Sequence, residues 1–338
     1  MHSFIHFLNK AGFGWLVPVV RLCAGDAPRE QGRQILRLIV APIAAIIVFL
    51  MIWAVISSKL ETNLGALPGP GAVWEQTSNL WTEHREQRQA RAEFYERQEE
   101  RKAVFQERFP DREWQARDFR SSPTFIDQIY TSLQTVFTGF FFASVVAIPL
   151  GILCGLSKTF YTSINPLIQI FKPVSPLAWL PIVMILVSSL YTTDDPFFTR
   201  SFLSSAIVVA LCSLWPTLIN TAVGVASIDR DHLNVAKVLK LGWAKKVWKI
   251  VIPSSLPYIF TGLRLSLGVG WMVLIAAEML AQSPGLGLFV WDMYQSSSSQ
   301  TLALIMVAVL TIGILGFMLD RIMLTLQQLV TFEDKPAT

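Results

Sequence analysis

The amino-acid sequence predicts an all-α membrane protein with six transmembrane helices. Of its 338 residues, 52% are hydrophobic and only 15% are charged, whereas a soluble domain carries about 25% charged residues. The mean hydropathy is +0.47. The apolar residues are also gathered in runs long enough to cross a hydrocarbon core of about 30 Å, and polar segments separate these runs.

The N-terminal part is expected to be cytoplasmic and to lead into the first span. Residues 1–34 are expected to be a cytoplasmic or interfacial segment: residues 1–23 are apolar but interrupted by Lys10 and Arg21, a pattern typical of a segment at the membrane interface. Residues 35–57 form the first transmembrane helix at about 1.5 Å per residue. The arginines that precede this run place its start in the cytoplasm.

A charged segment follows on the outer side, by parity with the first span. Within residues 58–125, the sequence L-P-G-P-G at positions 67–71 is expected to end regular structure, and a charged helical insertion covers residues 82–120. Opposite charges three or four positions apart favour this helix. Phe94, Phe105 and Phe109 recur at helical spacing and would form a thin apolar edge.

Five further spans make a core at residues 126–326, and residues 327–338 are a cytoplasmic tail. The spans are expected at residues 126–156, 166–190, 202–226, 258–281 and 302–326. The second of these is interrupted by Pro173, Pro176 and Pro181, because proline breaks the backbone hydrogen-bond ladder. Six spans put both termini on the cytoplasmic side.

The polar segment at residues 227–257 lies between two of these spans. It reads S-I-D-R-D-H-L-N-V-A-K-V-L-K-L-G-W-A-K-K-V-W-K-I-V-I-P-S-S-L-P. The pattern predicts two short amphipathic helices, with a turn at Gly242, a stop at Pro253, and Asp229 or Asp231 as the cap of the first helix. Its lysines favour the cytoplasmic side. Two interpretations remain: a loop lying on lipid, or a surface on which a partner protein pushes.

Enzymatic chemistry has little support in the sequence. The four histidines have no metal-ligand spacing, and neither an H-E-x-x-H nor a Walker A sequence is present. No G-x-S-x-G elbow is present either. Cys23, Cys154 and Cys212 are far apart and are interpreted as small hydrophobic residues. We therefore expect no enzyme activity, no cofactor and no metal site. Nucleic-acid binding is not expected, since basic and acidic residues alternate in the charged segment.

An ion-coupled carrier is the remaining self-powered alternative, and it is less favoured because ionisable residues in the spans are sparse. Glu278 lies near the outer end of its span and is a weak candidate for a proton relay. Arg264 has two interpretations. It either reaches the cytoplasmic surface or pairs with a neighbouring carbonyl, or it contributes positive potential to an anion path. Glycines at positions 262, 268 and 270 permit close approach of another helix.

Four stretches resemble a known family. They are L-P-Y-I-F-T-G-L-R-L-S-L-G-V-G-W-M-V-L-I-A-A-E-M-L at 256–280, S-L-Q-T-V-F-T-G-F at 132–140, P-L-A-W-L-P at 176–181 and P-G-L-G-L-F-V-W-D at 284–292. With them, the sequence resembles the permeases of ABC importers, specifically the nitrate, sulfonate/taurine and bicarbonate group. The resemblance covers roughly residues 67–326 apart from the charged insertion. It implies the type I importer permease fold and a multi-pass location in the bacterial inner membrane.

The resemblance also assigns a role to the polar segment. The ATPase-coupling loop of this family reads E-A-A, three residues, Gly, nine residues and then I-x-L-P. The matching positions are Asn234, Val235 and Ala236 for E-A-A, Lys240 for the glycine, and Ile250, Ile252 and Pro253 for the end, with Gly242 at the turn. The glutamate and the glycine of the pattern are therefore absent here.

By the same resemblance, two permease chains form the pathway through the membrane and cytoplasmic ATPase subunits grip the coupling loops. A periplasmic or lipid-anchored binding protein delivers the substrate. Nitrate, with nitrite, is the first choice of substrate, and sulfonate or taurine and bicarbonate are the alternatives. The charged insertion is either a solvated helix or a docking surface for the binding protein.

Overall fold

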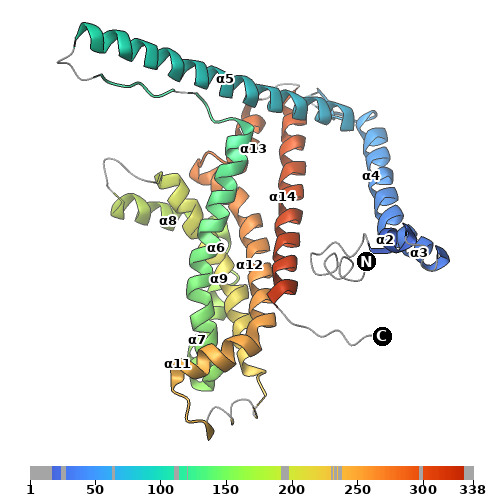
Figure 1. Ribbon diagram of the computed structural model, residues 1–338, viewed down its shortest axis with the longest axis vertical. Helices are drawn as coiled ribbons and strands as arrows, with labels where there is room; N and C mark the ends of the chain where they lie inside the picture. The colour runs from blue at the N-terminus through green and yellow to red at the C-terminus, as the bar shows by residue number, and fades with distance from the viewer. Residues whose placement is uncertain are drawn as a thin grey trace.

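The computed structural model describes residues 17–23, 28–62, 65–109, 114–119, 121–191, 198–229, 231, 234, 238–296 and 300–330. Nearly all of this is helical (Figure 1). The only strands among the described residues are β1 (Glu61–Thr62) and β2 (Gly65–Ala66), which form a two-residue antiparallel pair. The prediction of an all-α membrane fold is therefore confirmed.

The first apolar helix stands apart from the rest of the chain. Helices α2 (Val17–Cys23) and α3 (Pro28–Ile35) lead through a π-helical turn, η2 (Leu36–Val40), into α4 (Ala41–Ser57). Helix α4 is separate from the bundle in Figure 1, and only its Trp53 and Ser57 are buried. The indole N–H of Trp53 donates to the carbonyl of Pro68 at 3.2 Å. This bond fixes the corner between α4 and the next helix.

Helix α5 (Pro70–Arg108) lies across one end of the bundle (Figure 1). It starts earlier and ends earlier than the helix predicted for residues 82–120. The expected break at 67–71 is confirmed for residues 67–69, which lie between β2 and α5, and is wrong for Pro70 and Gly71, which already belong to α5. Pro70 is suited to the first turn of a helix because its fixed φ is helical and its missing N–H has no partner there. The L-P-G-P-G sequence thus begins a helix.

The distal half of α5 is covered by the chain that returns to the bundle. Ring centroids of Phe94 and Phe119 are 5.4 Å apart, and those of Phe105 and Trp114 are 5.3 Å apart. Gln98 donates to the carbonyl of Arg117 at 2.9 Å. The apolar edge expected on this helix is therefore real, and it packs against residues 114–119 of the same chain. We call α5 beyond residue 82, with this return segment, the arm.

Four long helices form the bundle: α6 (Phe125–Leu156), α9 (Arg200–Ala226), α12 (Ile252–Ala281) and α14 (Thr301–Val330). Helix α9 packs against both α6 and α12. Gly262 allows the second contact, since a Cβ there would lie 2.9 Å from Asn220 Cβ and from Thr217 Cα. By contrast, a Cβ at Gly268 would meet nothing within 4 Å. The close approach expected at these glycines thus occurs at Gly262 and, less tightly, at Gly270, where a Cβ would lie 3.3 Å from Val209 Cγ1, but not at Gly268.

The proline-rich span is broken, as the sequence predicts. It consists of α7 (Lys158–Phe171) and α8 (Pro176–Leu190), which meet at an angle of 99°. The break falls between them, Pro176 begins α8 and Pro181 lies inside it. Helix α13 (Leu286–Ser296) follows α12 at the end of the bundle near α5. The described residues hold five helices long and apolar enough to cross a membrane, or up to six if the bent pair counts as one span.

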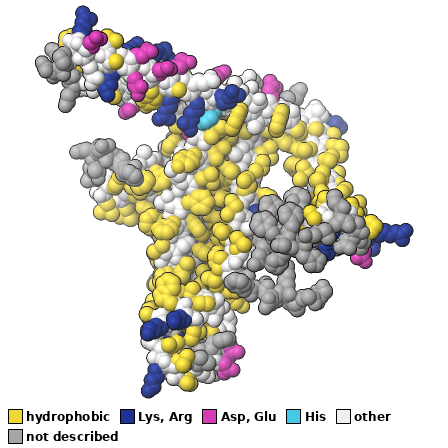
Figure 2. Space-filling model, viewed as in Figure 1, with side chains coloured by type: hydrophobic (Ala, Val, Ile, Leu, Met, Phe, Trp, Pro, Cys, Tyr) yellow, Lys and Arg dark blue, Asp and Glu magenta, His cyan; other side chains and the backbone are white. Residues whose placement is uncertain are grey.

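Side-chain chemistry divides the surface into an apolar belt and charged ends (Figure 2). Large hydrophobic side chains are exposed along the bundle, among them Phe141, Ile185, Met272 and Phe317. Basic side chains gather at the end opposite α5, and acidic and basic residues cover α5. An apolar belt of this kind is what lipid requires of a protein that spans it. We call the two ends of the bundle the α5 end and the α11 end.

Candidate functional site: the polar segment and the links of helix α12

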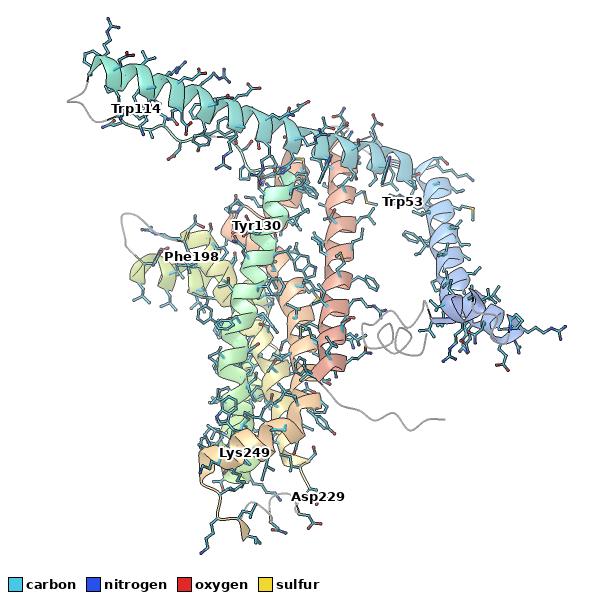
Figure 3. The ribbon with its side chains drawn as sticks, in the orientation of Figure 1. Trp53, Trp114, Tyr130, Phe198, Asp229 and Lys249 are labelled. Carbon is cyan, nitrogen blue, oxygen red and sulfur yellow. The ribbon has the colours of Figure 1, made fainter. Side chains whose placement is uncertain are left out.

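The polar segment at 227–257 lies at the α11 end, where Figure 3 labels Asp229 and Lys249. Its second half consists of α11 (Trp243–Lys246) and a π-helical turn, η3 (Val247–Val251), which continues into α12. Together they make one helical run from Trp243 to Ala281. The predicted stop at Pro253 is wrong, because the helical run passes through this proline, which lies just after the π-helical turn η3.

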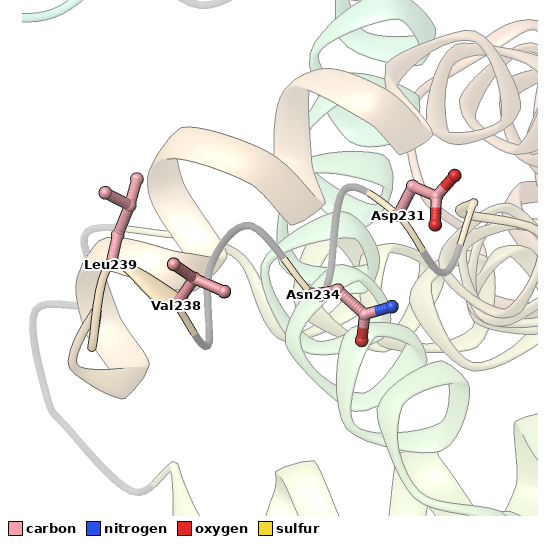
Figure 4. Close-up of a pocket in the computed structure, with 4 residues that line it drawn as sticks. All are labelled: Asp231, Asn234, Val238 and Leu239. Atoms are coloured by element: carbon pink, nitrogen blue, oxygen red, sulfur yellow. The ribbon is translucent and has the colours of Figure 1, made fainter.

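Among the described residues of the first predicted helix, Asp231, Asn234 and Val238 are helical. The Asp229 carboxylate accepts from the Asp231 backbone N–H at 3.0 Å, so Asp229 serves as the predicted cap. Val235 and Ala236 lie outside the described side chains. Asp231, Asn234, Val238 and Leu239 line an open cavity of about 410 Å³ (Figure 4).

Lys240, which the resemblance aligns with the glycine of the family pattern, has a backbone conformation that suits glycine. Its φ is +47°, in the left-handed region. Glycine enters this region without steric cost, whereas a residue with a Cβ is strained there. Gly242, two residues later, has an ordinary φ of −62° and precedes α11. The turn between the two helices is therefore made at Lys240 as much as at the predicted Gly242.

The second half of the segment has two different faces. Val247 and Val251 are buried and pack in one cluster with Ile152 of α6 and Val225 of α9. Trp243 and Trp248 point away from the bundle, with 64% and 72% of their surface exposed. One face thus fixes the segment to the bundle, and the other presents two tryptophans among lysines. Sequence reasoning missed these tryptophans, although aromatic residues in a lysine-rich segment are a usable signal for an interface.

Arg264 is not a free charge. Its guanidinium donates to both carboxylate oxygens of Asp320 on α14, from Nε at 2.6 Å and from Nη2 at 2.9 Å. The two side chains are 37% and 42% exposed. The expected pairing with a carbonyl is therefore wrong, because a carboxylate of opposite charge lies within reach. Opposite charges in two apolar spans could have indicated this pair from sequence.

Two further hydrogen bonds join the same pair of helices. The Gln327 amide of α14 donates to the Thr261 hydroxyl of α12 at 3.2 Å. The indole N–H of Trp271 on α12 donates to the carbonyl of Ile312 at 3.0 Å. With the ion pair, these bonds link α12 to α14 over several turns. Helix α12 therefore continues from the polar segment at one end, and side-chain bonds connect it to α14 along its length.

Near the α5 end, Glu278 of α12 is fully buried. It accepts from the Ser132 hydroxyl at 2.8 Å and from the backbone N–H of Gly287 at 3.0 Å, both at the same oxygen. Among the residues that the structure describes, no three His, Cys, Asp or Glu side chains gather closely enough to hold a metal ion.

A bundle of long apolar helices with an apolar belt defines a membrane-spanning protein. Residues 147–331 match the family described as the inner-membrane component of binding-protein-dependent transport systems. The chain belongs to this family. It is the permease subunit of an ABC importer, a multi-pass inner-membrane protein and not an enzyme, and it works with ATPase and substrate-binding partners.

Several curated relatives are transport permeases. The nitrate import permease protein NrtB of Synechocystis sp. is 40% identical over 203 residues, which cover 60% of this chain and 69% of that protein. The bicarbonate transport system permease protein CmpB of Synechococcus elongatus is 35% identical over 300 residues, which cover 88% of this chain and 92% of that protein.

Solved structures show the same fold at low sequence identity. A chain from the MetNI methionine ABC transporter, in an inward-facing conformation, has a TM-score of 0.52 and 14% identity, and the match covers 61% of this chain and 96% of that one. A second crystal form of MetNI has a TM-score of 0.54 and 13% identity. The fold is therefore that of a type I importer permease, as the sequence predicts.

Proposed function

We propose that this permease imports nitrate, together with nitrite. The single observation that carries the choice is the 40% identity with a nitrate import permease, in a stretch that spans more than two thirds of that protein. The test is uptake of labelled nitrate by cells that express the complete transporter, with labelled bicarbonate and taurine as parallel substrates. Saturable, ATP-dependent nitrate uptake is the expected result. No nitrate uptake alongside strong uptake of another anion would reject the choice.

Bicarbonate is the second candidate, and a specific observation favours it. The match to the bicarbonate permease extends over 88% of this chain, compared with 60% for the nitrate permease. Nitrate and bicarbonate are both small planar anions with one negative charge, and neither demands a large pocket. Competition separates the candidates: unlabelled bicarbonate in excess leaves nitrate uptake unchanged if nitrate is the substrate.

We further propose that the polar segment is the contact with the ATPase, with Asn234 to Pro253 as its coupling part. Support comes from the two faces of the segment: Val247 and Val251 are held by the bundle, while Trp243 and Trp248 are open to a partner. A surface of exposed tryptophans is typical of a protein interface. A chain without residues 227–257 should insert into the membrane and fail to bind its ATPase on co-purification. ATPase retention by this chain would contradict the proposal.

We propose that the α11 end faces the cytoplasm and the α5 end faces outward, with both chain termini inside. The lysines at the α11 end support this orientation (Lys240, Lys245, Lys246, Lys249), because positive loops remain on the cytoplasmic side. Single cysteines at the exposed positions Trp243 and Trp74 provide the test. A membrane-impermeant thiol reagent added to intact spheroplasts should label the second and spare the first.

A homodimer is the assembly that we propose. Its support is α4, whose side chains are apolar on every face and exposed except for Trp53 and Ser57. Because so little of α4 is covered by its own chain, its surface is open to packing by a second copy within the membrane. The mass of the detergent-solubilised complex decides between one copy and two of this chain.

The arm keeps its two interpretations, a solvated helix or a docking surface for the binding protein. Its own charges are close to balance, and its aromatic edge is already covered by residues 114–119. Replacing residues 85–118 with a short glycine-serine linker is the discriminating change. A weaker apparent affinity for loaded binding protein supports docking, and an unchanged affinity supports a solvated helix.

A further inference from the structure

Glu278 is a buried carboxylate with neutral hydrogen-bond partners. One of its oxygens, Oε2, accepts from the Ser132 hydroxyl and from the Gly287 backbone N–H. The other, Oε1, is buried with no hydrogen-bond partner. Neither ion pair found among the described residues involves Glu278. Burial of such a group is costly, and a well-packed apolar side chain would serve stability better.

The hydrogen bonds around Glu278 join three helices. Ser132 lies on α6, and its hydroxyl oxygen also accepts from the backbone N–H of Leu286 at 2.9 Å. Leu286 and Gly287 are the first residues of α13, so their N–H groups have no partner within that helix. Ser132 and Glu278 therefore cap α13 from two other helices. Beside them, the rings of Phe125 on α6 and Phe289 on α13 are 4.8 Å apart.

Two glycines make room for the carboxylate. A Cβ at Gly285 would lie 2.3 Å from Cδ and from both carboxylate oxygens of Glu278. A Cβ at Gly287 would lie 2.2 Å from the carbonyl oxygen of Ile275. The turn at residues 282–285 thus lies directly against the carboxylate. We call Glu278, Ser132 and the first two residues of α13 the latch.

The latch sits at the far end of the helical run that starts in the polar segment. That run is continuous from Trp243 to Ala281, so one helix connects the polar segment to the latch and can carry a displacement between them. Without the latch, α13 would be attached to α12 only by the turn and by apolar packing. Hydrogen bonds give a defined geometry, which apolar contacts alone do not enforce.

We propose that Glu278 is a positioning residue for transport: it fastens α13 and the α12–α13 turn to α6, so that the outer ends of these helices move as one unit when the ATPase acts. The inference rests on the proposed coupling role of the polar segment. Glu278 itself does not need to contact substrate. Its carboxylate acts as an acceptor of fixed geometry, and its charge is not required.

The first measurement does not need transport. Cysteines at the exposed positions Tyr130 on α6 and Tyr294 on α13 carry spin labels, in a chain whose own cysteines are replaced by alanine. We expect a narrow distance distribution for Glu278 and for Glu278→Gln, whose amide oxygen can still accept both hydrogen bonds. Glu278→Ala should broaden the distribution, because two donors lose their acceptor. An equally narrow distribution in Glu278→Ala overturns the proposal, whichever substrate the transporter imports.

Gly285 supplies a second test, in which atoms are added beside the carboxylate and the carboxylate itself is kept. The Gly285→Ala substitution adds a Cβ in the space of the carboxylate, and it should broaden the distribution in the same way as Glu278→Ala. In a chain that already carries Glu278→Ala, the same added Cβ meets no carboxylate and should change little. Such non-additivity is expected only for groups in direct contact. Additive effects of the two substitutions would overturn the proposed geometry.

The second measurement concerns coupling, in membranes that contain the complete transporter. Glu278→Ala should lower the maximal rate of uptake by about tenfold, equal to about 1.4 kcal/mol. Basal ATP hydrolysis and binding of the ATPase should stay unchanged, and Glu278→Gln should restore uptake. Ser132→Ala, a milder change, should give an intermediate rate. Equal loss in the Ala and Gln variants would contradict the acceptor role, and normal uptake in Glu278→Ala would contradict the latch altogether.

Discussion

Arg264 and Asp320 form a bidentate ion pair between α12 and α14, with N–O distances of 2.6 and 2.9 Å. The pair lies in the apolar part of the bundle and is only partly exposed. Pairing of this geometry neutralises Arg264 in the structure. Any contribution of Arg264 to an anion path therefore requires that an anion compete with Asp320, or that the two helices move apart.

Substitution of either partner should destabilise the permease, and substitution of both should restore it. Arg264→Leu and Asp320→Leu each leave one charge unpaired, and we expect each to lower the free energy of unfolding by about 1–2 kcal/mol, since partial exposure moderates the cost. The double variant removes both charges and should regain most of this loss in thermal unfolding. Uptake by the double variant then isolates the role of Arg264. A normal rate means that Arg264 serves only the pair, and a low rate assigns it to the anion path.

Two glycines of α12 should respond in opposite ways to the same added methyl group. Gly262→Ala places a Cβ 2.9 Å from Asn220 Cβ and Thr217 Cα, and we expect a cost of about 1–3 kcal/mol as α12 is pushed from α9. Gly268→Ala meets nothing within 4 Å and should be neutral or stabilising by up to about 1 kcal/mol, because alanine favours helix. Thermal unfolding of the two purified variants is the measurement. A similar response at both positions would contradict the packing of α12 on α9.

Lys240 should tolerate glycine better than its neighbours do. Lys240→Gly removes the strain of a left-handed residue and should stabilise the turn by about 1 kcal/mol. Lys245→Gly removes the same charge from α11, and it should cost about 1 kcal/mol because glycine disfavours helix. Lys240→Val, with a branched Cβ, should be the most damaging of the three. Proteolytic cleavage rates within the segment report these differences, and equal rates for the two glycine variants would refute the conformational explanation.

The exposed tryptophans of the polar segment should matter for assembly more than for stability. Trp243→Ala and Trp248→Ala should each weaken ATPase binding by about tenfold or more, as expected for an aromatic anchor. Neither should alter the thermal stability of the permease alone by more than about 0.5 kcal/mol, because both side chains are exposed. Trp74→Ala is the control, since Trp74 is 77% exposed near the opposite end. Unchanged ATPase binding by both variants would remove these residues from the interface.

Local residue patterns were sufficient for the class of protein and for most of its helices. The length of the apolar runs predicted the spans. In lipid, a single segment can pair its backbone N–H and C=O groups only by forming a helix. Prolines 173 and 176 indicated the break between α7 and α8, and Asp229 was correctly among the predicted caps. Errors arose at prolines, because a proline can mark either the end of a helix or a position near its start. Pro70 and Pro253 were read as stops, yet Pro70 begins α5 and the helical run from Trp243 passes through Pro253.

The pairings between distant residues were decided only by the tertiary structure. Asp320 lies 56 positions from Arg264, and Ser132 lies 146 positions from Glu278, so no local periodicity could show that they meet. Whether a glycine of α12 contacts a neighbouring helix likewise depends on which atoms that helix places opposite it, as Gly262 and Gly268 show. The sequence by itself determined that this chain spans a membrane, since hydrophobicity is a property of each segment. Packing decided which groups the few ionisable side chains of the spans meet, because a buried polar group needs hydrogen-bond partners that are brought to it in three dimensions.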